Sequence, residues 1–242
     1  KKIALENSER CHAAIQLLEM HSHVLMLKKP RILELGVDKG QSTKIFLNAL
    51  NIVNSGSLVS VDIRDCSEVA SSKTWQFVQA DSTDEHKILA AAPKITDGLD
   101  VIYVDSLHTE DHVMKEIFTF YKYLKVGGVM YFDDVDSYPY MKKQRKDSVE
   151  LEIANRKINR LLINIFRQNI KLVRLNFEYG STGLGKLTKL SNEELLPIQS
   201  VIKERENLRL SKIVNKFLGR KNYQHNLTDS SSFQIDVTKY KQ

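Results

Sequence analysis

The first half of the sequence alternates short apolar segments with longer amphipathic ones. Strand-like apolar runs occur at 31–36, 57–62, 74–80, 99–105 and 127–134. The segments around them predict helices at 8–28, 41–50, 85–92 and 109–124. This alternation is typical of βαβ units, whose strands form a parallel sheet.

The pattern changes after the fifth strand. A long helix is predicted at 148–168, and strands at 170–177 and 183–190 would give the sheet a hairpin-like end. Charged residues at 192–218 predict one or two more helices, and 222–242 is polar. We therefore expect a Rossmann-like, doubly wound α/β fold. Its sheet would be mostly parallel and seven-stranded, with added N- and C-terminal helices.

The chain is long enough for one such domain with a substantial core, since it has 242 residues. Residues 30–190 would form this domain. The N-terminal helix, within 1–29, would serve as an oligomer contact or as a lid. The remainder, 191–242, would be a helical and polar extension.

The charge balance raises the question of a nucleic-acid partner. Lys and Arg number 36 against 30 Asp and Glu, a net charge of +6, and the densest basic cluster lies at 142–146. A solvated, lysine-rich surface accounts for this balance, and an anionic substrate or RNA are the alternatives.

The two cysteines, Cys11 and Cys66, form no CxxC pair, which argues against a disulfide framework and favours a reducing, cytoplasmic location. No apolar run approaches the roughly 20 residues that span a bilayer. The N-terminus also lacks the apolar stretch of a signal peptide.

Acidic residues at the ends of two predicted strands suggest a metal site. Asp105 ends one strand with His108 just beyond it, and Asp133 and Asp134 end the next. Ligands of open parallel sheets collect at the carboxyl ends of the strands, so these side chains should meet. Carboxylates are ligands for a hard cation, and His108 could remove a proton from a substrate hydroxyl. Separately, each feature is also explained by a solvated turn or a surface histidine.

A glycine turn follows the first strand and predicts a ligand-binding loop. Gly36 and Gly40 would let the backbone approach a ligand, and the helix from Gln41 would point its N–H groups at it. The turn is neither a P-loop nor a full GxGxxG, because Asp38 stands at the second glycine position. Glu34, just before the turn, favours a cationic or hydroxyl-bearing ligand over a phosphate.

Two more acidic residues close the second and third strands. Asp62 lies where a carboxylate can accept hydrogen bonds from both ribose hydroxyls of a nucleoside. Asp81, with Ser82 beside it, could accept a bond from an adenine amino group. Each could instead be a helix cap, but four successive acidic strand ends are poorly explained by capping.

The order of these features resembles the class I S-adenosylmethionine-dependent methyltransferases. Residues 34–43 look like the first motif of that family, Asp62 like its ribose-binding acid, and Asp81 like its adenine-side acid. Residues 104–108 and 127–134 are similar to the metal-dependent O-methyltransferase branch. That branch includes macrolide-sugar and rhamnosyl methyltransferases and cephalosporin-hydroxylase-like proteins.

The resemblance implies roles for individual residues. The S-adenosylmethionine-binding set would be Glu34, Gly36, Gly40, Ser42, Asp62, Asp81, Ser82 and Asp105. Asp105, Asp133 and Asp134 would hold Mg²⁺ or another divalent cation, and His108 would be the general base. The chain departs from the branch at Ser106 and Leu107, where many relatives have Gly-Asp.

The expected function is Mg²⁺-dependent transfer of a methyl group to a hydroxyl of a small, sugar-like molecule or of a natural-product or polysaccharide precursor. Two alternatives stay open. The basic charge would suit an RNA methyltransferase, although the metal-type strand ends argue against nucleic acid. The helices at 8–28 and 192–218 would suit a non-catalytic interaction module, and the first is also a candidate contact in a homo-oligomer.

Overall fold

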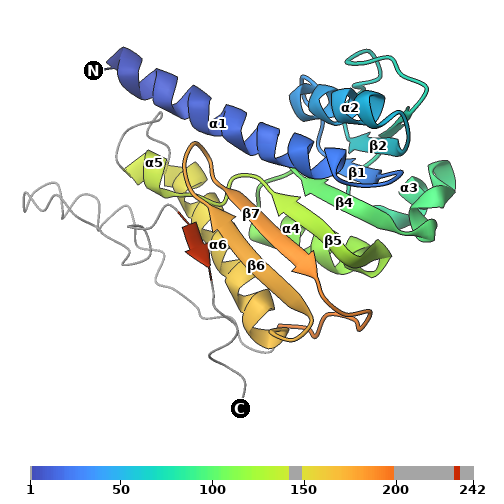
Figure 1. Cartoon of the computed structure of the whole chain (residues 1–242). Helices are drawn as coiled ribbons and strands as arrows, with labels where there is room; N and C mark the ends of the chain where they lie inside the picture. The colour runs from blue at the N-terminus through green and yellow to red at the C-terminus, as the bar shows by residue number, and fades with distance from the viewer. Residues whose placement is uncertain (1, 142–148, 199–231, 235–242) are drawn as a thin grey trace, which may run out of the picture.

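A central sheet organises the computed structural model, which describes residues 2–141, 149–198 and 232–234. In the described chain the strand order is β3-β2-β1-β4-β5-β7-β6-β8 (Figure 1). The bounds are β1 (Arg31–Leu35), β2 (Ser57–Asp62), β3 (Trp75–Gln79), β4 (Leu99–Val104), β5 (Leu124–Phe132), β6 (Val173–Glu178), β7 (Leu184–Lys189) and β8 (Ser232–Gln234). β1 to β5 are parallel, whereas β7 is antiparallel to β5 and β6. The seven predicted strands are confirmed, and β8 adds a short antiparallel edge beside β6.

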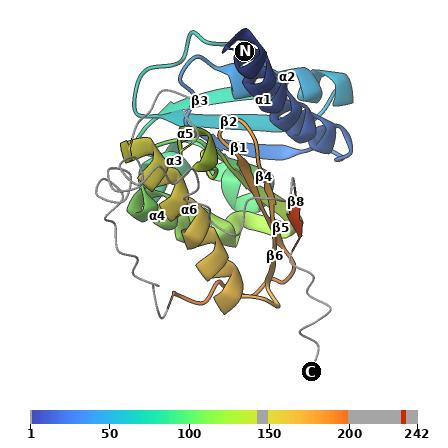
Figure 2. The ribbon, with the colours of Figure 1, turned by 90° about the vertical axis from the view of Figure 1, so that its left-hand side faces the viewer.

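Helices cover both faces of the sheet, as Figure 2 shows, which confirms the doubly wound fold. One face carries α1 (Lys2–Leu25) and α2 (Gln41–Val53), and the other carries α3 (Glu85–Ala91), α4 (Glu110–Phe120) and α6 (Val149–Gln168). The remaining helical segments are η1 (Pro93–Asp97), η2 (Tyr121–Tyr123) and α5 (Tyr138–Met141).

Alternate strand residues build two separate cores, because successive side chains point to opposite faces. Ile32 and Tyr131 face α1 and α2, where they pack with Met20, Phe46 and Leu50. Leu33, Met130 and their neighbours face the helices on the other side, where they pack with Ile88, Ile117, Phe120, Leu162 and Ile165. This explains why the central strands read as continuous apolar runs.

The strand order reverses between β1 and β4, which places a crevice at their carboxyl ends. Gly36 closes β1 with φ +97°, and a Cβ atom there would overlap the carbonyl oxygen of Asp105. The Asp105 N–H in turn donates a hydrogen bond to the Leu35 carbonyl at 2.8 Å. The glycine thus lets the two strand ends lie side by side.

Several predicted boundaries differ from the structure. Helix α1 ends at Leu25 and not at residue 28. Helix α4 ends at Phe120 and not at residue 124, and β5 begins at Leu124 and not at residue 127, so Gly127 and Gly128 lie inside the strand. The strand pairing shifts register in this region, between Leu99 and Val101, which accommodates the early start of β5.

The C-terminal extension lies largely outside the described residues. Its described beginning, 191–198, is not helical, so the predicted helix does not start at residue 192. The rest of that prediction, up to residue 218, cannot be compared with the structure, and β8 is the part of 222–242 that is described. Within the described ranges, no helix is both long and apolar enough to cross a bilayer.

Candidate active site

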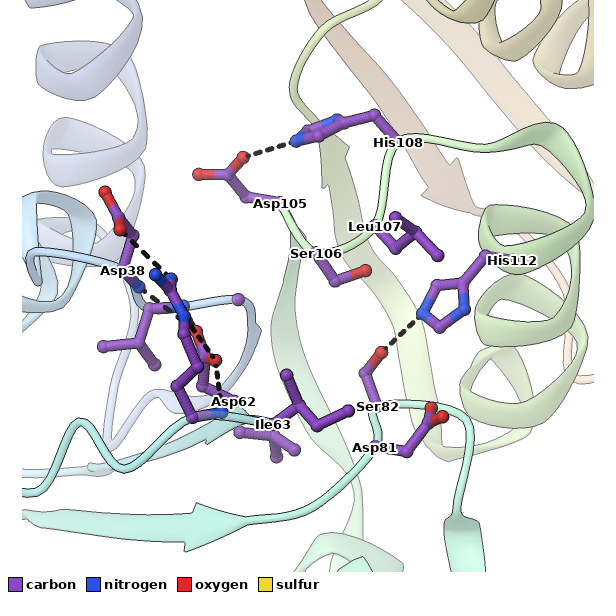
Figure 3. Close-up of a pocket in the computed structure, with 14 residues that line it drawn as sticks. Asp38, Asp62, Ile63, Asp81, Ser82, Asp105, Ser106, Leu107, His108 and His112 are labelled. Carbon is purple, nitrogen blue, oxygen red and sulfur yellow. Dashed lines mark hydrogen bonds and ion pairs between the residues drawn. The ribbon is translucent and has the colours of Figure 1, made fainter.

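A cavity of about 580 Å³ opens at the carboxyl ends of β1, β2 and β4. This volume is typical of small-molecule sites. Asp105 and His108 lie toward one end of it, and Ser82 and His112 toward the other (Figure 3). The predicted site residues that line it are Gly36, Asp62, Asp81, Ser82, Asp105 and His108. Gly36 and His108, 72 positions apart in the sequence, therefore meet at one site.

Glu34 lies below this cavity and does not line it. Its carboxylate is fully buried and accepts hydrogen bonds from the hydroxyls of Ser42 (2.6 Å), Thr43 (2.7 Å) and Ser60 (2.6 Å). Burial raises the pKa of Glu34 to about 7, although these three hydroxyls act in the opposite direction. Glu34 therefore ties the first turn of α2 to β1 and β2. The structure does not show the predicted contact of Glu34 and Ser42 with the cofactor cavity.

Asp62 anchors the glycine turn from the end of β2. Its Oδ2 accepts hydrogen bonds from the N–H groups of Val37 (2.9 Å) and Asp38 (3.2 Å), and its Oδ1 accepts one from the Arg64 N–H (2.9 Å). Burial alone would raise the pKa of Asp62, but these donors and the Arg64 charge outweigh it and lower the pKa. The carboxylate is therefore ionised and rigidly held.

The Arg64 side chain lies over this carboxylate. Its Nε is 3.6 Å from Asp62 Oδ1, and its NH2 group donates to Asp38 Oδ1 at 3.1 Å. The guanidinium is largely exposed, with a side-chain exposure of 64%. A diol that binds Asp62 would meet this exposed group first.

The far end of the cavity carries a network that the sequence analysis did not predict. Ser82 Oγ lies 2.8 Å from His112 Nε2, and Ser106 Oγ donates to Glu116 Oε1 at 2.5 Å. His112 Nε2 is also 3.4 Å from Glu116 Oε1, and the hydrogen bond to Glu116 raises the pKa of His112. One signal was available, since His112 and Glu116 are four residues apart on a helix.

Asp81 lines the cavity beside this network, but its carboxylate already has local partners. Its Oδ1 accepts hydrogen bonds from both the N–H and the hydroxyl of Thr83, each with a donor–acceptor distance of 2.8 Å. These bonds lower the pKa of Asp81. The second carboxylate oxygen has no such bond to Thr83, so the residue still presents an acceptor for an amino group.

The four residues of the predicted metal-and-base group do meet. His108 Nε2 lies 3.3 Å from Asp105 Oδ1, and His108 Nδ1 lies 3.4 Å from Asp134 Oδ2. The third carboxylate, Asp133, is joined to Asp105 by Tyr103, whose hydroxyl lies 3.2 Å from Asp105 Oδ2 and 3.5 Å from Asp133 Oδ2. Sequence reasoning missed Tyr103, which reads as one more core aromatic of β4.

The carboxylates of this group lie close enough together to change one another's pKa. Burial raises the pKa of Asp133 to about 7, and the carboxylates of Asp105 and Asp134 act in the same direction. The Thr182 hydroxyl donates to Asp133 Oδ1 at 2.7 Å and partly offsets them. Burial would lower the pKa of His108, but the adjacent carboxylates raise it to about 9. In this arrangement His108 carries a proton at neutral pH.

The three carboxylates of this group are suitable ligands for a hard cation, but their present positions do not form a metal site. Asp105, Asp133 and Asp134 supply carboxylate oxygens, which are the ligand type that Mg²⁺ prefers in proteins. However, among the described residues no three acidic, histidine or cysteine groups are placed to hold a metal ion together. His108 and the Tyr103 hydroxyl lie between the carboxylates, and these contacts would have to open for a metal to bind.

A second, smaller cavity of about 120 Å³ lies on the other side of Asp105. Asp105 and Asp133 form part of its wall, together with Ser42, Tyr103 and Thr182. Helix α1 closes it through Gln16, Leu17 and Met20. Asp105, a member of the predicted metal-and-base group, thus lines both cavities.

The sheet order, the crevice at β1 and β4, and the acidic strand ends define the fold of a class I S-adenosylmethionine-dependent methyltransferase. In agreement, residues 33–135 match a family model described as a methyltransferase domain. This match confirms the resemblance to methyltransferases found in the sequence. A search of curated proteins found no match.

Solved structures share the fold at low identity. MycE, a methyltransferase of the mycinamycin biosynthetic pathway solved with Mg and S-adenosylhomocysteine, has a TM-score of 0.52 and 17% identity. The match covers 74% of this chain and 50% of MycE, so the chain spans about half the length of that protein.

Two further structures match over most of their length. A methyltransferase of Podospora anserina bound to S-adenosylhomocysteine has a TM-score of 0.58 and 14% identity, with 78% of this chain and 88% of that chain covered. A Clostridium thermocellum protein, proposed to be an rRNA methylase, has a TM-score of 0.52 and 11% identity, with 72% and 96% covered. At such identities the likeness concerns the fold and leaves the acceptor open.

Proposed function

We propose that the protein transfers a methyl group from S-adenosylmethionine to a hydroxyl of a small molecule. The observation that carries this proposal is the pair of cavities that share Asp105. The larger cavity has the volume and acidic strand ends that suit a nucleoside cofactor. The smaller one is lined by Asp105 and by Asp133. A methyl donor and an acceptor placed in them would meet at Asp105 beside His108.

The cofactor would be held by the strand ends. Asp62 would accept hydrogen bonds from the ribose hydroxyls once the exposed Arg64 side chain turns away, and Asp81 and Ser82 would face the adenine. Gly36 would let the backbone approach the cofactor closely. Asp62 is suited to this role because the backbone N–H groups of the turn already fix its carboxylate.

The reaction needs a base, and His108 is the candidate. The acceptor oxygen would attack the methyl carbon in line with the C–S bond. The sulfonium would leave as the neutral thioether of S-adenosylhomocysteine, and the hydroxyl proton would pass to His108. The imidazole must be neutral to accept this proton, so the negative charge of Asp105 and Asp134 that holds its pKa near 9 must be balanced first.

The proposal extends to a divalent cation, Mg²⁺ being the one present in the MycE structure. Asp105, Asp133 and Asp134 would hold it, and it would favour the ionised form of an acceptor hydroxyl. Two features of this chain support it. The pKa of Asp133 is raised to about 7 by burial and by the neighbouring carboxylates, and a cation would also relieve the charge that keeps His108 protonated.

Two experiments test the proposal. Calorimetric titration with S-adenosylhomocysteine, in Mg²⁺ and in EDTA, should show micromolar binding, and absence of binding in both buffers would refute it. With an acceptor in hand, His108→Ala should lose methyl transfer but keep S-adenosylhomocysteine binding. His86→Ala, on the exposed face of α3, is the matched control. Full turnover by His108→Ala would exclude its role as the base.

Cation binding has its own readout. Mn²⁺ titration followed by electron paramagnetic resonance should show a site that weakens when Asp133 and Asp134 are both changed to Asn. An unchanged Mn²⁺ affinity in that variant would remove the metal from the proposal without affecting the cofactor site.

An RNA acceptor is the second candidate, motivated by the net charge of +6. The densest basic cluster, 142–146, lies outside the described residues. Steeply salt-dependent binding of RNA would favour this candidate. Cofactor binding without methyl transfer to any acceptor would instead favour a non-catalytic interaction module.

A further inference from the structure

A buried carboxylate lies behind the far end of the larger cavity, and the proposed reaction does not use it. Glu116 of α4 is 0% exposed, and its Oε2 has no hydrogen-bond partner within the described part of the chain. Its Oε1 faces Ser106 and His112, which both line the cavity. Burial of a carboxylate with one oxygen unpartnered costs stability, so we expect Glu116 to have a role beyond packing.

Glu116 determines which nitrogen of His112 carries a hydrogen. His112 Nε2 lies 3.4 Å from Glu116 Oε1 and 2.8 Å from Ser82 Oγ. A carboxylate can only accept hydrogen bonds. A lone pair on Nε2 would therefore be repelled by Glu116, whereas an N–H group there is attracted. It follows that Nε2 carries a hydrogen whether the ring is neutral or charged.

This placement of the hydrogen orients two serine hydroxyls in opposite ways. Because His112 Nε2 donates to Ser82 Oγ, the hydroxyl hydrogen of Ser82 is left for a ligand in the cavity. Ser106 instead donates its hydrogen to Glu116 at 2.5 Å, so its Oγ presents only lone pairs to a ligand. One end of the cavity therefore holds a fixed donor and a fixed acceptor.

We propose that Glu116 and His112 are positioning residues that make Ser82 a hydrogen-bond donor and thereby select a 6-aminopurine over a 6-oxopurine. Adenine has an amino group at C6 and an unprotonated N1, which match an acceptor beside a donor. Hypoxanthine has a carbonyl at C6 and a hydrogen on N1, so both positions are reversed. Asp81, beside Ser82 at the same end of the cavity, supplies a further acceptor (Figure 3).

The inference rests on the proposed binding of S-adenosylmethionine, and it assigns the residues through which the protein distinguishes the base. Neither residue needs to touch the base. Glu116 acts through His112, and His112 acts through Ser82. The pair should therefore affect the choice between two bases, which a contribution to packing alone would leave unchanged.

The hydrogen on Nε2 can be tested in the unmodified protein. Long-range ¹H–¹⁵N correlation spectra show which imidazole nitrogen carries a hydrogen, and His112→Gln identifies the His112 signals among those of the seven histidines. A neutral His112 ring with its hydrogen on Nδ1 would overturn the inference. Glu116→Gln should lower the pKa of His112, because Glu116 and Asp81 raise it while Lys115 acts in the opposite direction.

Base selection is tested with S-adenosylhomocysteine and S-inosylhomocysteine, which differ only at C6 and N1 of the purine. In calorimetric titration the unmodified protein should bind the adenosine compound about tenfold or more tightly than the inosine compound. His112→Leu should lower this ratio about fivefold, because the Ser82 hydroxyl is then free to turn. His112→Gln should retain the ratio, since its amide can place an N–H near the position of Nε2. His86→Leu, at an exposed position of α3, is the matched control and should change neither affinity.

Ser82→Ala tests the same hydroxyl directly, and it remains available if His112→Leu does not fold. It should lower the ratio as His112→Leu does. In a Ser82→Ala background, His112→Leu should lower the ratio no further, because both residues act through one hydroxyl.

Three results would overturn the inference while cofactor binding stands: equal affinity for the two ligands, an unchanged ratio in Ser82→Ala, or equal losses of both ligands in His112→Leu. Failure of S-adenosylhomocysteine to bind the unmodified protein would instead remove the proposed function, and the base selection with it.

Discussion

The buried carboxyl of Glu34 should make the stability of the protein depend on pH. Burial raises its pKa from 4.5 to about 7. Between these two values the unfolded chain releases the proton while the folded protein retains it. The contribution of Glu34 to the free energy of unfolding is therefore fully present below pH 4.5 and is lost as the pH rises through 7. A rise in pKa of this size corresponds to about 3 kcal/mol.

The perturbation is Glu34→Gln, which removes the ionisable group and keeps one acceptor oxygen for the hydroxyls of Ser42, Thr43 and Ser60. The variant should lose about 1 kcal/mol at low pH, since the hydrogen bonds must rearrange. Above pH 7.5 it should be more stable than the unmodified protein by about 2 kcal/mol, because the ionisation penalty of about 3 kcal/mol is gone.

The assay is urea denaturation from pH 4.5 to 8, followed by tryptophan fluorescence. The sole tryptophan, Trp75, is well placed, because its indole N–H donates to Ser60 Oγ at 2.9 Å, and Ser60 in turn donates to Glu34. Glu194→Gln, on an exposed side chain, is the control. Asp133 also has a raised pKa and contributes to the pH dependence of both proteins. The quantity to compare is therefore the difference in free energy of unfolding between the variant and the unmodified protein at each pH. Parallel pH profiles for the two proteins would refute the reasoning.

Three further predictions concern the cofactor cavity. Gly36→Ala should lower the thermal unfolding temperature and abolish S-adenosylhomocysteine binding, because a Cβ atom would overlap Asp105 at a φ of +97°; wild-type affinity would contradict the close approach. Asp62→Asn should weaken S-adenosylhomocysteine roughly 10- to 100-fold in calorimetry, from the loss of about 1.5–3 kcal/mol of charge-assisted hydrogen bonding. Arg64→Ala should leave binding unchanged or tighten it, since it uncovers Asp62; a tenfold loss would show that Arg64 contacts the ligand.

The sequence was sufficient to predict the parallel sheet and the meeting of its strand ends. β2 has the predicted bounds, and Asp62, Asp81, Asp105 and His108 line one cavity. Both results follow from local patterns, since apolar runs define strands and a parallel sheet brings their carboxyl ends to one edge.

What the sequence did not provide depends on contacts between distant residues. Thr182 reaches Asp133 across 49 residues, and Gln16 reaches Gly180 across 164. No local pattern reports such pairs. The environment of Glu34 was not predictable for a related reason. The sequence around a strand-end carboxylate is the same whether that carboxylate faces a ligand or three buried hydroxyls.

The smaller cavity, proposed to hold the acceptor, is walled in part by segments that flank the methyltransferase-domain match in the chain. Gln16, Leu17, Met20 and Leu184 lie outside residues 33–135, the part that matches the methyltransferase domain. Mutations in these flanks can therefore accumulate without disturbing the glycine turn or Asp62. Two descendants of one ancestor could retain the same cofactor chemistry and diverge in the compound they modify. An exchange of residues 13–20 and 180–184 between such relatives would be the shortest route to a new product.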